Sequence, residues 1–115
     1  MNDSVEKADT PAYLVAMVSI SDDTGRYMTD YALPVIPIVA KYGGEVLAAS
    51  SDANKVEGKG HFNWTVILRF QNRKQLDAFY FSSEYEPYLK LRKESLTKGG
   101  EVVLVTGFDS SVRLG

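Results

Sequence analysis

The segment Tyr42–Phe70 limits the fold more than any other part of the chain. It begins with Tyr42-Gly43-Gly44, which is typical of a helix end, and continues with the short apolar run Glu45–Ala49. After a polar region that contains Gly58 and Gly60, it ends in Trp64–Phe70, where large apolar residues alternate with period two. The pattern predicts two antiparallel strands joined by a long hairpin.

The chain before this segment predicts a strand and a helix. Ala12–Ile20 is apolar at almost every position, so we expect a strand that is covered on both faces. From Thr24 to Tyr42 the apolar period changes to 3.6, with Tyr27, Tyr31, Val35, Ile38 and Tyr42 on one helix face. Pro34 and Pro37 lie inside this pattern, and each lacks a backbone donor, so the helix should kink or break into two pieces.

The chain after Phe70 predicts a helical region and a last strand. A helix should follow Gln71-Asn72, and Ser83-Glu84-Tyr85-Glu86 matches the capping box of a fresh helix start. Gly99-Gly100 should end that helix, and Glu101–Thr106 should form the last strand. The order β-α-β-β-α-β predicts an α+β, ferredoxin-like fold with a four-stranded antiparallel sheet and both helices on one face.

Length and composition indicate one folded domain. The 115 residues leave little room for a second domain, and we expect a domain over residues 12–108 between flexible tails at 1–11 and 109–115. The N-terminal stretch lacks the apolar core of a secretory signal, and no apolar run is long enough to span a membrane, so a cytoplasmic location is expected. A net charge of −2 argues against binding to nucleic acid or to a membrane surface.

The free face of the predicted sheet indicates a partner. Its strands carry apolar residues on both sides in part, and a monomer should not leave such a surface in water. A second copy of the chain, related by a two-fold axis, is the simplest cover. The sequence therefore predicts a homodimer.

Several motifs together resemble one known family. The Tyr-Gly-Gly and Ser-x-x-Tyr…Arg elements are the most specific, and the strands add to them. The matching pieces are Tyr13-Leu14-Val15, Tyr31 before Pro37, Tyr42-Gly43-Gly44-Glu45-Val46-Leu47, Glu57-Gly58, Val66-Ile67-Leu68-Arg69-Phe70, and Ser83-Glu84-Tyr85 followed by Leu91-Arg92. Over residues 12 to 108 the chain resembles the DUF1330 family, which lies in the dimeric α/β-barrel superfamily.

The resemblance implies the ferredoxin-like fold and a homodimer in which two sheets pack into a barrel. It implies no established reaction, because the family is named for unknown function. The wider superfamily includes cofactor-free monooxygenases, lactone isomerases, haem-degrading enzymes and small-molecule-sensing domains. This chain departs from the family at Arg69, where an acidic residue is usual.

Two residues are candidate catalytic groups. His61 is the only histidine, and its side chain titrates near neutrality, so a proton-transfer site would use it. It is equally compatible with a solvated turn or with packing beside Trp64. Tyr31 belongs to a set of tyrosines on the helices that could either surround an aromatic substrate or pack in the core and at an interface.

Four residues are candidate substrate-binding groups: Arg69, Tyr80, Tyr85 and Arg92. Arg92 shares a helix face with Tyr85 and could hold a carboxylate ligand, or it could form a structural ion pair with Glu84, Glu86 or Asp30. Arg69 could point into a cavity or lie on a solvated edge. One histidine and no cysteine give weak support for a metal site, and no cofactor is expected.

Two functional hypotheses follow from these residues. The first is a small cofactor-independent enzyme, similar to a monooxygenase or an isomerase, that acts on a small aromatic or polyketide-like molecule. It predicts a cavity lined by His61, Tyr31, Tyr80 and at least one arginine. The second is a non-catalytic dimeric module that binds a small molecule or has a structural role.

Overall fold

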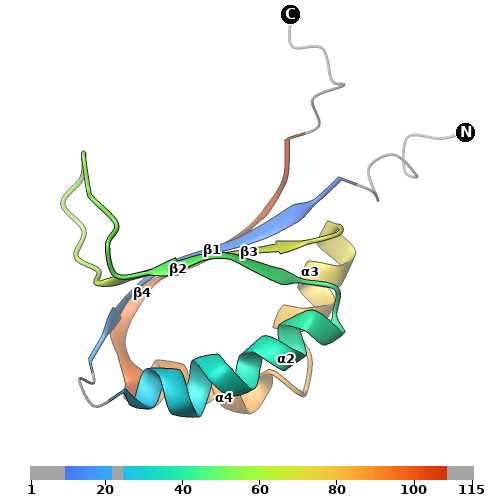
Figure 1. The fold of residues 1–115 in the computed structure, drawn as a ribbon, viewed down its shortest axis with the longest axis horizontal. Coiled ribbons are helices and arrows are strands. Elements are labelled where there is room, and N and C mark those ends of the chain that lie inside the picture. Colours follow the sequence, from blue (N-terminus) through green and yellow to red (C-terminus); the bar gives the residue numbers. More distant parts are fainter. Residues whose placement is uncertain (1–9, 22–24, 109–115) are drawn as a thin grey trace, which may run out of the picture.

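A four-stranded antiparallel sheet forms one layer of the protein (Figure 1). The computed structural model describes residues 10–21 and 25–108, so both expected tails lie largely outside the described residues. The strands lie in the order β2-β3-β1-β4. Their bounds are β1 Ala12–Ile20, β2 Glu45–Ser50, β3 Trp64–Phe70 and β4 Thr97–Thr106. The predicted ferredoxin-like α+β fold is confirmed.

The register of the strands separates two faces of the sheet. Leu14 lies opposite both Leu68 on β3 and Leu104 on β4, and all three side chains belong to the core or pack against it. Val15, one residue later, lies opposite Ile67 and Val103 on the other face. Because side chains alternate along a strand, the first set faces the helices and the second set faces away.

The first helical region runs past Pro34 and Pro37 without a break, and its hydrogen-bonding pattern changes just before Pro34. A π-helical segment, η1 (Tyr27–Ala32), runs directly into the α-helix α2 (Leu33–Lys41). The Leu33 N–H bonds to the carbonyl of Met28, five residues back, and Pro34 has no N–H to donate to the preceding turn. The helix ends where Gly43 adopts a φ of 84°, a conformation that glycine reaches without strain.

In the second helical region, the start of the first helix is as predicted, but the predicted cap of the second helix is wrong. Helix α3 (Arg73–Tyr80) begins as expected, with the Asn72 side chain accepting the Gln75 N–H at 2.9 Å. Helix α4 (Glu86–Leu91) continues into the π-helical segment η2 (Arg92–Leu96). The predicted capping box from Ser83 to Glu86 is wrong, because no side chain caps α4, whose N-cap residue is Tyr85. In the turn before the helix, the Ser82 hydroxyl accepts the Tyr85 N–H at 3.1 Å.

The start of the last strand is also corrected. Gly99-Gly100 does not end a helix, because the helix ends at Leu96 and β4 already begins at Thr97. The two glycines have φ values of 123° and 141° and lie where the register against β1 shifts between Val18 and Ile20. A Cβ on Gly100 would lie 2.5 Å from the Met17 carbonyl oxygen, so the glycine permits close approach of two backbones at a bulge.

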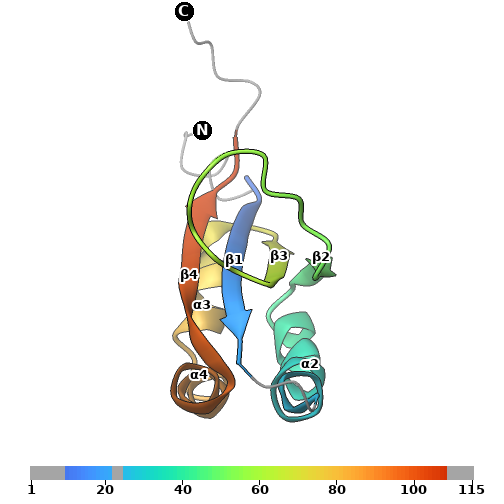
Figure 2. The same ribbon diagram turned by 90° about the vertical axis from the view of Figure 1, so that its left-hand side faces the viewer.

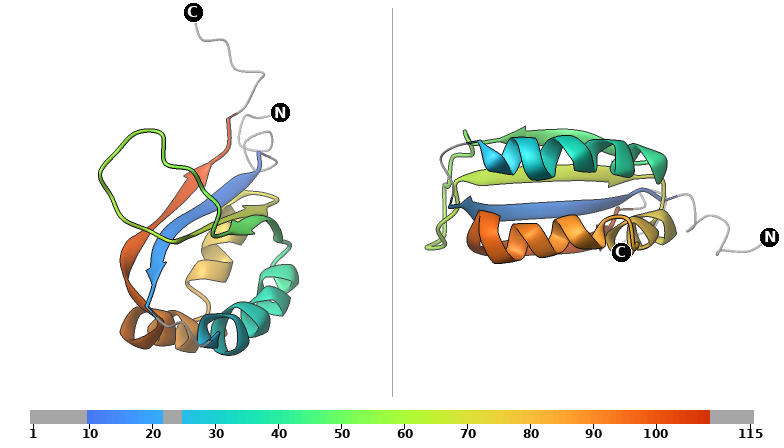
Figure 3. Two further views of the ribbon diagram at one scale, coloured as in Figure 1. Left: turned by 60° about the vertical axis from the view of Figure 1, so that its left-hand side comes forward. Right: turned by 90° about the horizontal axis from the view of Figure 1, so that it is seen from below.

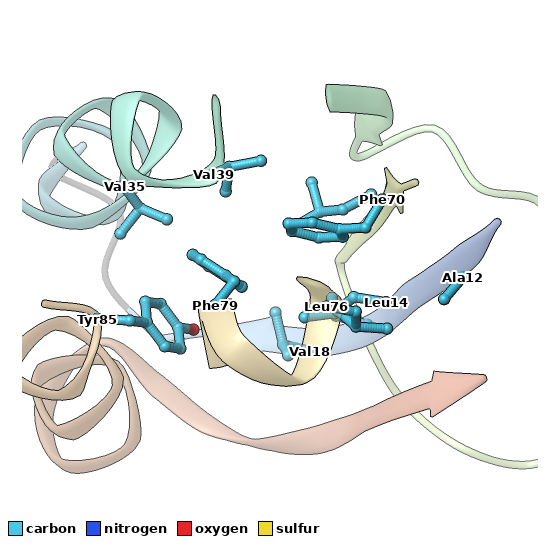
Figure 4. Packing of buried hydrophobic residues seen from close by; sticks show 11 residues of the cluster. Ala12, Leu14, Val18, Val35, Val39, Phe70, Leu76, Phe79 and Tyr85 are labelled. Carbon is cyan, nitrogen blue, oxygen red and sulfur yellow. The ribbon is translucent and has the colours of Figure 1, made fainter. Parts of the chain in front are cut away.

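The helices form a second layer on one face of the sheet. Seen from below, η1 and α2 form one row, and α3, α4 and η2 form the other, with the central strands between them (Figure 3). Viewed along the sheet, the rows containing α2 and α4 lie side by side at the same end (Figure 2). The core lies between the layers, where Val35, Val39, Phe79 and Tyr85 from the helical side point into the space above the sheet residues, and Phe79 stacks on Phe70 (Figure 4).

The opposite face of the sheet carries no helix among the described residues (Figure 1). Val103 is 51% exposed and Val105 45% exposed on this face, and Met17 is also exposed. The expectation that β1 is covered on both faces is therefore not met within one chain, because its second side lies on this outer face. The described residues contain no helix that is long and apolar enough to cross a membrane.

Candidate ligand-binding site

An apolar cavity of about 110 Å³ lies between the two layers. Strands β1 and β3 form one wall and helix α2 forms the other, because the helix-facing side chains of the sheet do not fill the whole gap. The apolar walls include Leu14, Ala16, Val35, Val39, Val66 and Phe79. Met28, Ile36, Val46 and Ala49, which also line the cavity, are exposed, so the cavity has an apolar mouth between η1–α2 and the edge strand β2.

Tyrosine hydroxyls form the polar part of the cavity lining. The hydroxyls of Tyr31 and Tyr85 lie 2.5 Å apart, which is a short hydrogen bond. Tyr27 stacks at a tilt on Tyr31 with ring centroids 5.0 Å apart, and its ring meets Trp64 edge-on at 6.0 Å. These side chains come from η1, β3 and the start of α4, so the cluster forms only when both helical rows pack on the sheet.

Burial keeps these tyrosines in the neutral form. It raises the pKa of Tyr27 to about 12, although the positive charge of Arg92 acts in the opposite direction. Burial also raises the pKa values of Tyr31 and Tyr85 above the ordinary tyrosine value. At neutral pH the hydroxyls are therefore hydrogen-bond donors and acceptors without charge.

Arg92 places a buried positive charge next to the tyrosine cluster. It is only 7% exposed, and its guanidinium carbon lies 5.8 Å from the centroid of the Tyr31 ring. Its interactions are with the phenols of Tyr31, Tyr85 and Tyr80. Arg92 begins η2, which packs against η1, so two π-helical segments meet at this end of the cavity. Such segments frequently occur at functional sites.

Arg92 has no acidic partner among residues 10–21 and 25–108. No carboxylate oxygen of these residues lies within 4.0 Å of its nitrogens. Two of the acidic residues that were considered as partners pair elsewhere, because Glu84 binds Lys41 at 2.8 Å and Asp30 binds Arg26 at 3.1 Å. The structural ion pair is therefore absent from the described part of the chain, and the guanidinium faces neutral groups.

A second, more polar groove adjoins the cavity at Arg92. It has a volume of about 320 Å³ and is lined by Tyr80, Arg92, Lys93, Thr97, Gly99, Gly100 and Val102. Arg92 and Val102 line both spaces. The glycines leave the β4 backbone open on this side, and Lys93 adds a second cation. The buried arginine thus lies between an apolar cavity and a polar groove.

The structure brings together some of the predicted site residues and separates others. Tyr31, Tyr85 and Arg92 line the cavity, and Tyr80 lies beside Tyr85, with ring centroids 5.5 Å apart, and lines the groove. His61 is exposed in the hairpin, where its carbonyl accepts a hydrogen bond from Ser19, and it lines neither space. The catalytic role of His61 stays a prediction.

Arg69 also lies apart from the cavity. Its neighbours Leu68 and Phe70 face the core, so Arg69 is on the outer face of the sheet, where it pairs with Glu45 at 3.1 Å. A ligand in the cavity would not reach it. The substrate-binding role of Arg69 stays a prediction.

Tyr27 and Trp64 were not among the predicted site residues, although both line the cavity. Tyr27 lies one helical turn before Tyr31 on the same apolar face, and that spacing could have identified it. Trp64 lies on the helix-facing side of β3, in register with Val18. For metals, the described residues contain no group of three His, Cys, Asp or Glu side chains that could hold an ion.

Comparison with known proteins identifies the family. The domain of unknown function DUF1330 matches residues 11–108. The chain belongs to the DUF1330 family. A comparison of the sequence with curated proteins found no match.

Solved structures with the same fold have little sequence identity to this DUF1330 chain. A protein of unknown function from Rhodopseudomonas palustris is 11% identical, with a TM-score of 0.68 over 92% of this chain and 88% of that one. A dabb family protein with a ferredoxin-like fold from Mesorhizobium loti is 6% identical, with a TM-score of 0.55 over 92% and 99%. An uncharacterised NIPSNAP-like domain protein from Burkholderia xenovorans is 12% identical, with a TM-score of 0.54 over 93% of each chain. At these identities the likeness shows the fold alone.

Proposed function

We propose that this DUF1330 protein is a homodimeric binding protein for a small, largely apolar organic molecule. The cavity between the helices and the sheet carries the proposal. It is apolar over most of its wall, has a volume of about 110 Å³ and has a mouth at the edge strand β2. An apolar cavity of about 150 Å³ can bind benzene, so a molecule with one ring or a short branched chain is the expected size.

The tyrosine cluster gives such a ligand an orientation. The hydroxyls of Tyr31 and Tyr85 and the guanidinium of Arg92 lie together, whereas the walls formed by β1, β3 and α2 are apolar. A molecule with one polar group would place that group at the cluster and its apolar part against Val35 and Val66. A few well-placed polar groups in an apolar pocket are typical of small-molecule sites.

Ligand-dependent stabilisation tests the proposal. Toluene, phenol and benzyl alcohol should raise the melting temperature, because a ligand at 100 times its Kd adds about 2.7 kcal/mol to the free energy of unfolding. Ala49→Phe should block the mouth and abolish the shift, since Ala49 is an exposed residue that lines the cavity. Ala40→Phe adds the same side chain to an exposed site of α2 outside the cavity and should leave the shift unchanged. No stabilisation of the wild type by any of these compounds would contradict the proposal.

A cofactor-independent enzyme is the second candidate function, and the Tyr31–Tyr85 pair favours it. Two neutral phenols beside a guanidinium can stabilise negative charge that develops on a substrate oxygen, as in an enolate. In this hypothesis Tyr31 is a catalytic hydrogen-bond donor. Turnover of an aromatic or polyketide-like compound that is lost in Tyr31→Phe, with binding retained, would establish it. If the wild type binds such a compound but does not convert it, the enzyme hypothesis is excluded and the non-catalytic binding protein remains.

The homodimer is supported by the outer face of the sheet. Tyr13 lies opposite Val105, and Val15 lies opposite Val103 and Ile67, so apolar residues are contiguous across three strands. Val103→Glu should convert a dimer into a monomer in sedimentation velocity experiments at micromolar concentration, because it would bury a charge in the interface. Leu33→Glu, at an exposed position of α2, is the matched control and should stay dimeric. A monomeric wild type would exclude the homodimer.

A further inference from the structure

We infer that the ligand is a monocarboxylate, whose carboxylate binds Arg92 and whose ring-sized or branched apolar part fills the cavity. The inference rests on the proposed small-molecule binding and names the chemical class of the ligand. Three independent features carry it: the unpaired charge of Arg92, the neutral donors beside it, and the position of the arginine between an apolar and a polar space.

The first feature is a buried positive charge that meets no carboxylate in the part of the chain that the structure describes. Arg92 is 7% exposed, yet its neighbours are phenols rather than carboxylates within the described part of the chain. Removing a guanidinium from water is unfavourable unless its donors are satisfied and its charge is balanced. A guanidinium has five N–H donors in a planar fork that matches the two oxygens of a carboxylate. A bound carboxylate would supply the missing charge.

The second feature is the set of neutral donors around the same point. The Tyr31 and Tyr85 hydroxyls hydrogen-bond to each other, so one of the two protons is free to reach a further acceptor. Phenols are neutral at pH 7, and burial raises the pKa values of these two further, so neither hydroxyl repels an anion. A carboxylate oxygen is a better acceptor for these donors than a neutral carbonyl. The cluster therefore favours an anion over a neutral molecule of the same shape.

The third feature is the contrast between the two spaces that meet at Arg92. The cavity is apolar and about 110 Å³, so it takes one ring or a short branched chain but no second charge. The groove on the other side holds about 320 Å³ and is lined by Lys93 and the glycines of β4. A carboxylate at Arg92 would face this polar side while its apolar part lies inside. The geometry thus assigns one charged end and one apolar end to the ligand.

Calorimetric titration of the 115-residue chain with matched probes tests the inference. Benzoate and benzamide have nearly the same shape, but only benzoate is charged at pH 7. We expect benzoate to bind about tenfold to a hundredfold more tightly, the range of a hydrogen bond to a charged group. Arg92→Met should remove this preference, whereas Arg73→Met, at an arginine that pairs with Asp77 and lines neither space, should keep it. Circular dichroism checks that each variant is folded.

The outcomes separate the two proposals. Equal binding of benzoate and benzamide, or a preference for benzoate that persists in Arg92→Met, would overturn the carboxylate inference and leave the binding function in place. Binding of neither probe, together with no stabilisation by toluene, would overturn both. If Arg92→Met does not fold, Arg92→Lys replaces it, because lysine keeps the charge and loses the fork; about a tenfold loss of benzoate affinity is then expected.

Discussion

One arginine lies on each side of the sheet, Arg69 on a strand and Arg92 in η2, and the two charges have different surroundings. Arg69 on the outer face is half-exposed and binds Glu45 at 3.1 Å. Arg92, on the helix side, is buried and interacts with phenols. A charge near water needs little compensation, whereas a buried charge needs a partner. The exposed arginine has its carboxylate within the chain, and the buried arginine has a cavity beside it instead.

The apolar residues of the two faces differ in the same way. On the helix side, Phe70, Leu76 and Phe79 are fully buried by other parts of the same chain. On the outer face, Val103 and Val105 are about half-exposed. One face is therefore covered by folding of the chain itself, whereas the described residues leave the other face open, where the proposed second copy would lie. The predictions below test this difference.

The largest effect is expected from truncation of the covered face. Phe70→Ala should lower the free energy of unfolding by about 3 to 5 kcal/mol, because Phe70 is 0% exposed and the change leaves a cavity. Val103→Ala, the outer-face counterpart, should cost roughly 0.5 kcal/mol in the monomer. Urea denaturation at several protein concentrations measures both. A cost for Val103→Ala that grows with protein concentration would show that a second copy covers the outer face.

High pH should destabilise the covered face through its tyrosines. Burial raises the pKa of Tyr27 to about 12, so the unfolded chain, with an ordinary tyrosine pKa near 10, ionises first as the pH rises. The stabilising contribution is complete below pH ~10 and is lost towards pH ~12, which amounts to about 2 to 3 kcal/mol for this side chain.

Tyr27→Phe should weaken this alkaline destabilisation. Urea denaturation at pH 7, 10 and 12 measures the free energy of unfolding of the wild type and the variant. Between about pH 6 and pH 8 the difference in free energy of unfolding between wild type and variant should not change with pH, since the Tyr27 phenol is neutral in both the folded and the unfolded chain. An identical pH dependence for the two proteins would contradict the burial of the Tyr27 hydroxyl.

Gly100→Ala should disturb the point where β4 lies closest to β1. The added Cβ would lie 2.5 Å from the Met17 carbonyl oxygen and 2.6 Å from the Val18 Cα, at a φ of 141°. We expect a loss of about 2 kcal/mol in thermal denaturation. Gly99→Ala has the same kind of backbone strain, with φ at 123°, but meets no atom within 4 Å, so its cost should be smaller. Equal costs would show that strain alone, without the contact, determines the effect.

The smallest effect is expected from the outer-face ion pair. Glu45→Gln should lower the free energy of unfolding by about 0.2 to 1 kcal/mol, because both partners of the Arg69–Glu45 pair are exposed. The loss should shrink further at 1 M salt, where exposed charges are screened. Urea denaturation at two salt concentrations measures it. A salt-independent loss would indicate that the pair is buried in an assembly.

Local sequence patterns were sufficient for most of the fold. The period-two alternation of Trp64–Phe70 and the 3.6 period through Tyr27, Tyr31 and Val35 correctly predicted β3 and the first helical row. The predictions failed at Ser83 and at Gly99-Gly100. In both places one motif is compatible with two structures, because serines also accept hydrogen bonds in turns, as Ser82 does, and a glycine pair occurs at a bulge as well as at a helix end.

The candidate site was predicted only in part, for a different reason. Tyr31, Tyr85 and Arg92 were selected from the sequence, but so were His61 and Arg69, which lie away from the cavity. Residue type and helix face are local properties, whereas a cavity depends on how completely the helix side chains fill the space above the sheet. That depends on contacts between residues far apart in the sequence, such as Tyr31 and Tyr85, which are 54 positions apart.

The sequence by itself determined the order of the elements, the ferredoxin-like topology and the family, because periodicity and turn residues act within a few positions of each other. Only the tertiary structure decided that Arg92 is buried with no carboxylate partner among residues 10–21 and 25–108, and that Tyr27, Tyr31 and Tyr85 meet it at the end of an apolar cavity. The physical reason is that burial and charge balance depend on what packs around a residue from distant parts of the chain.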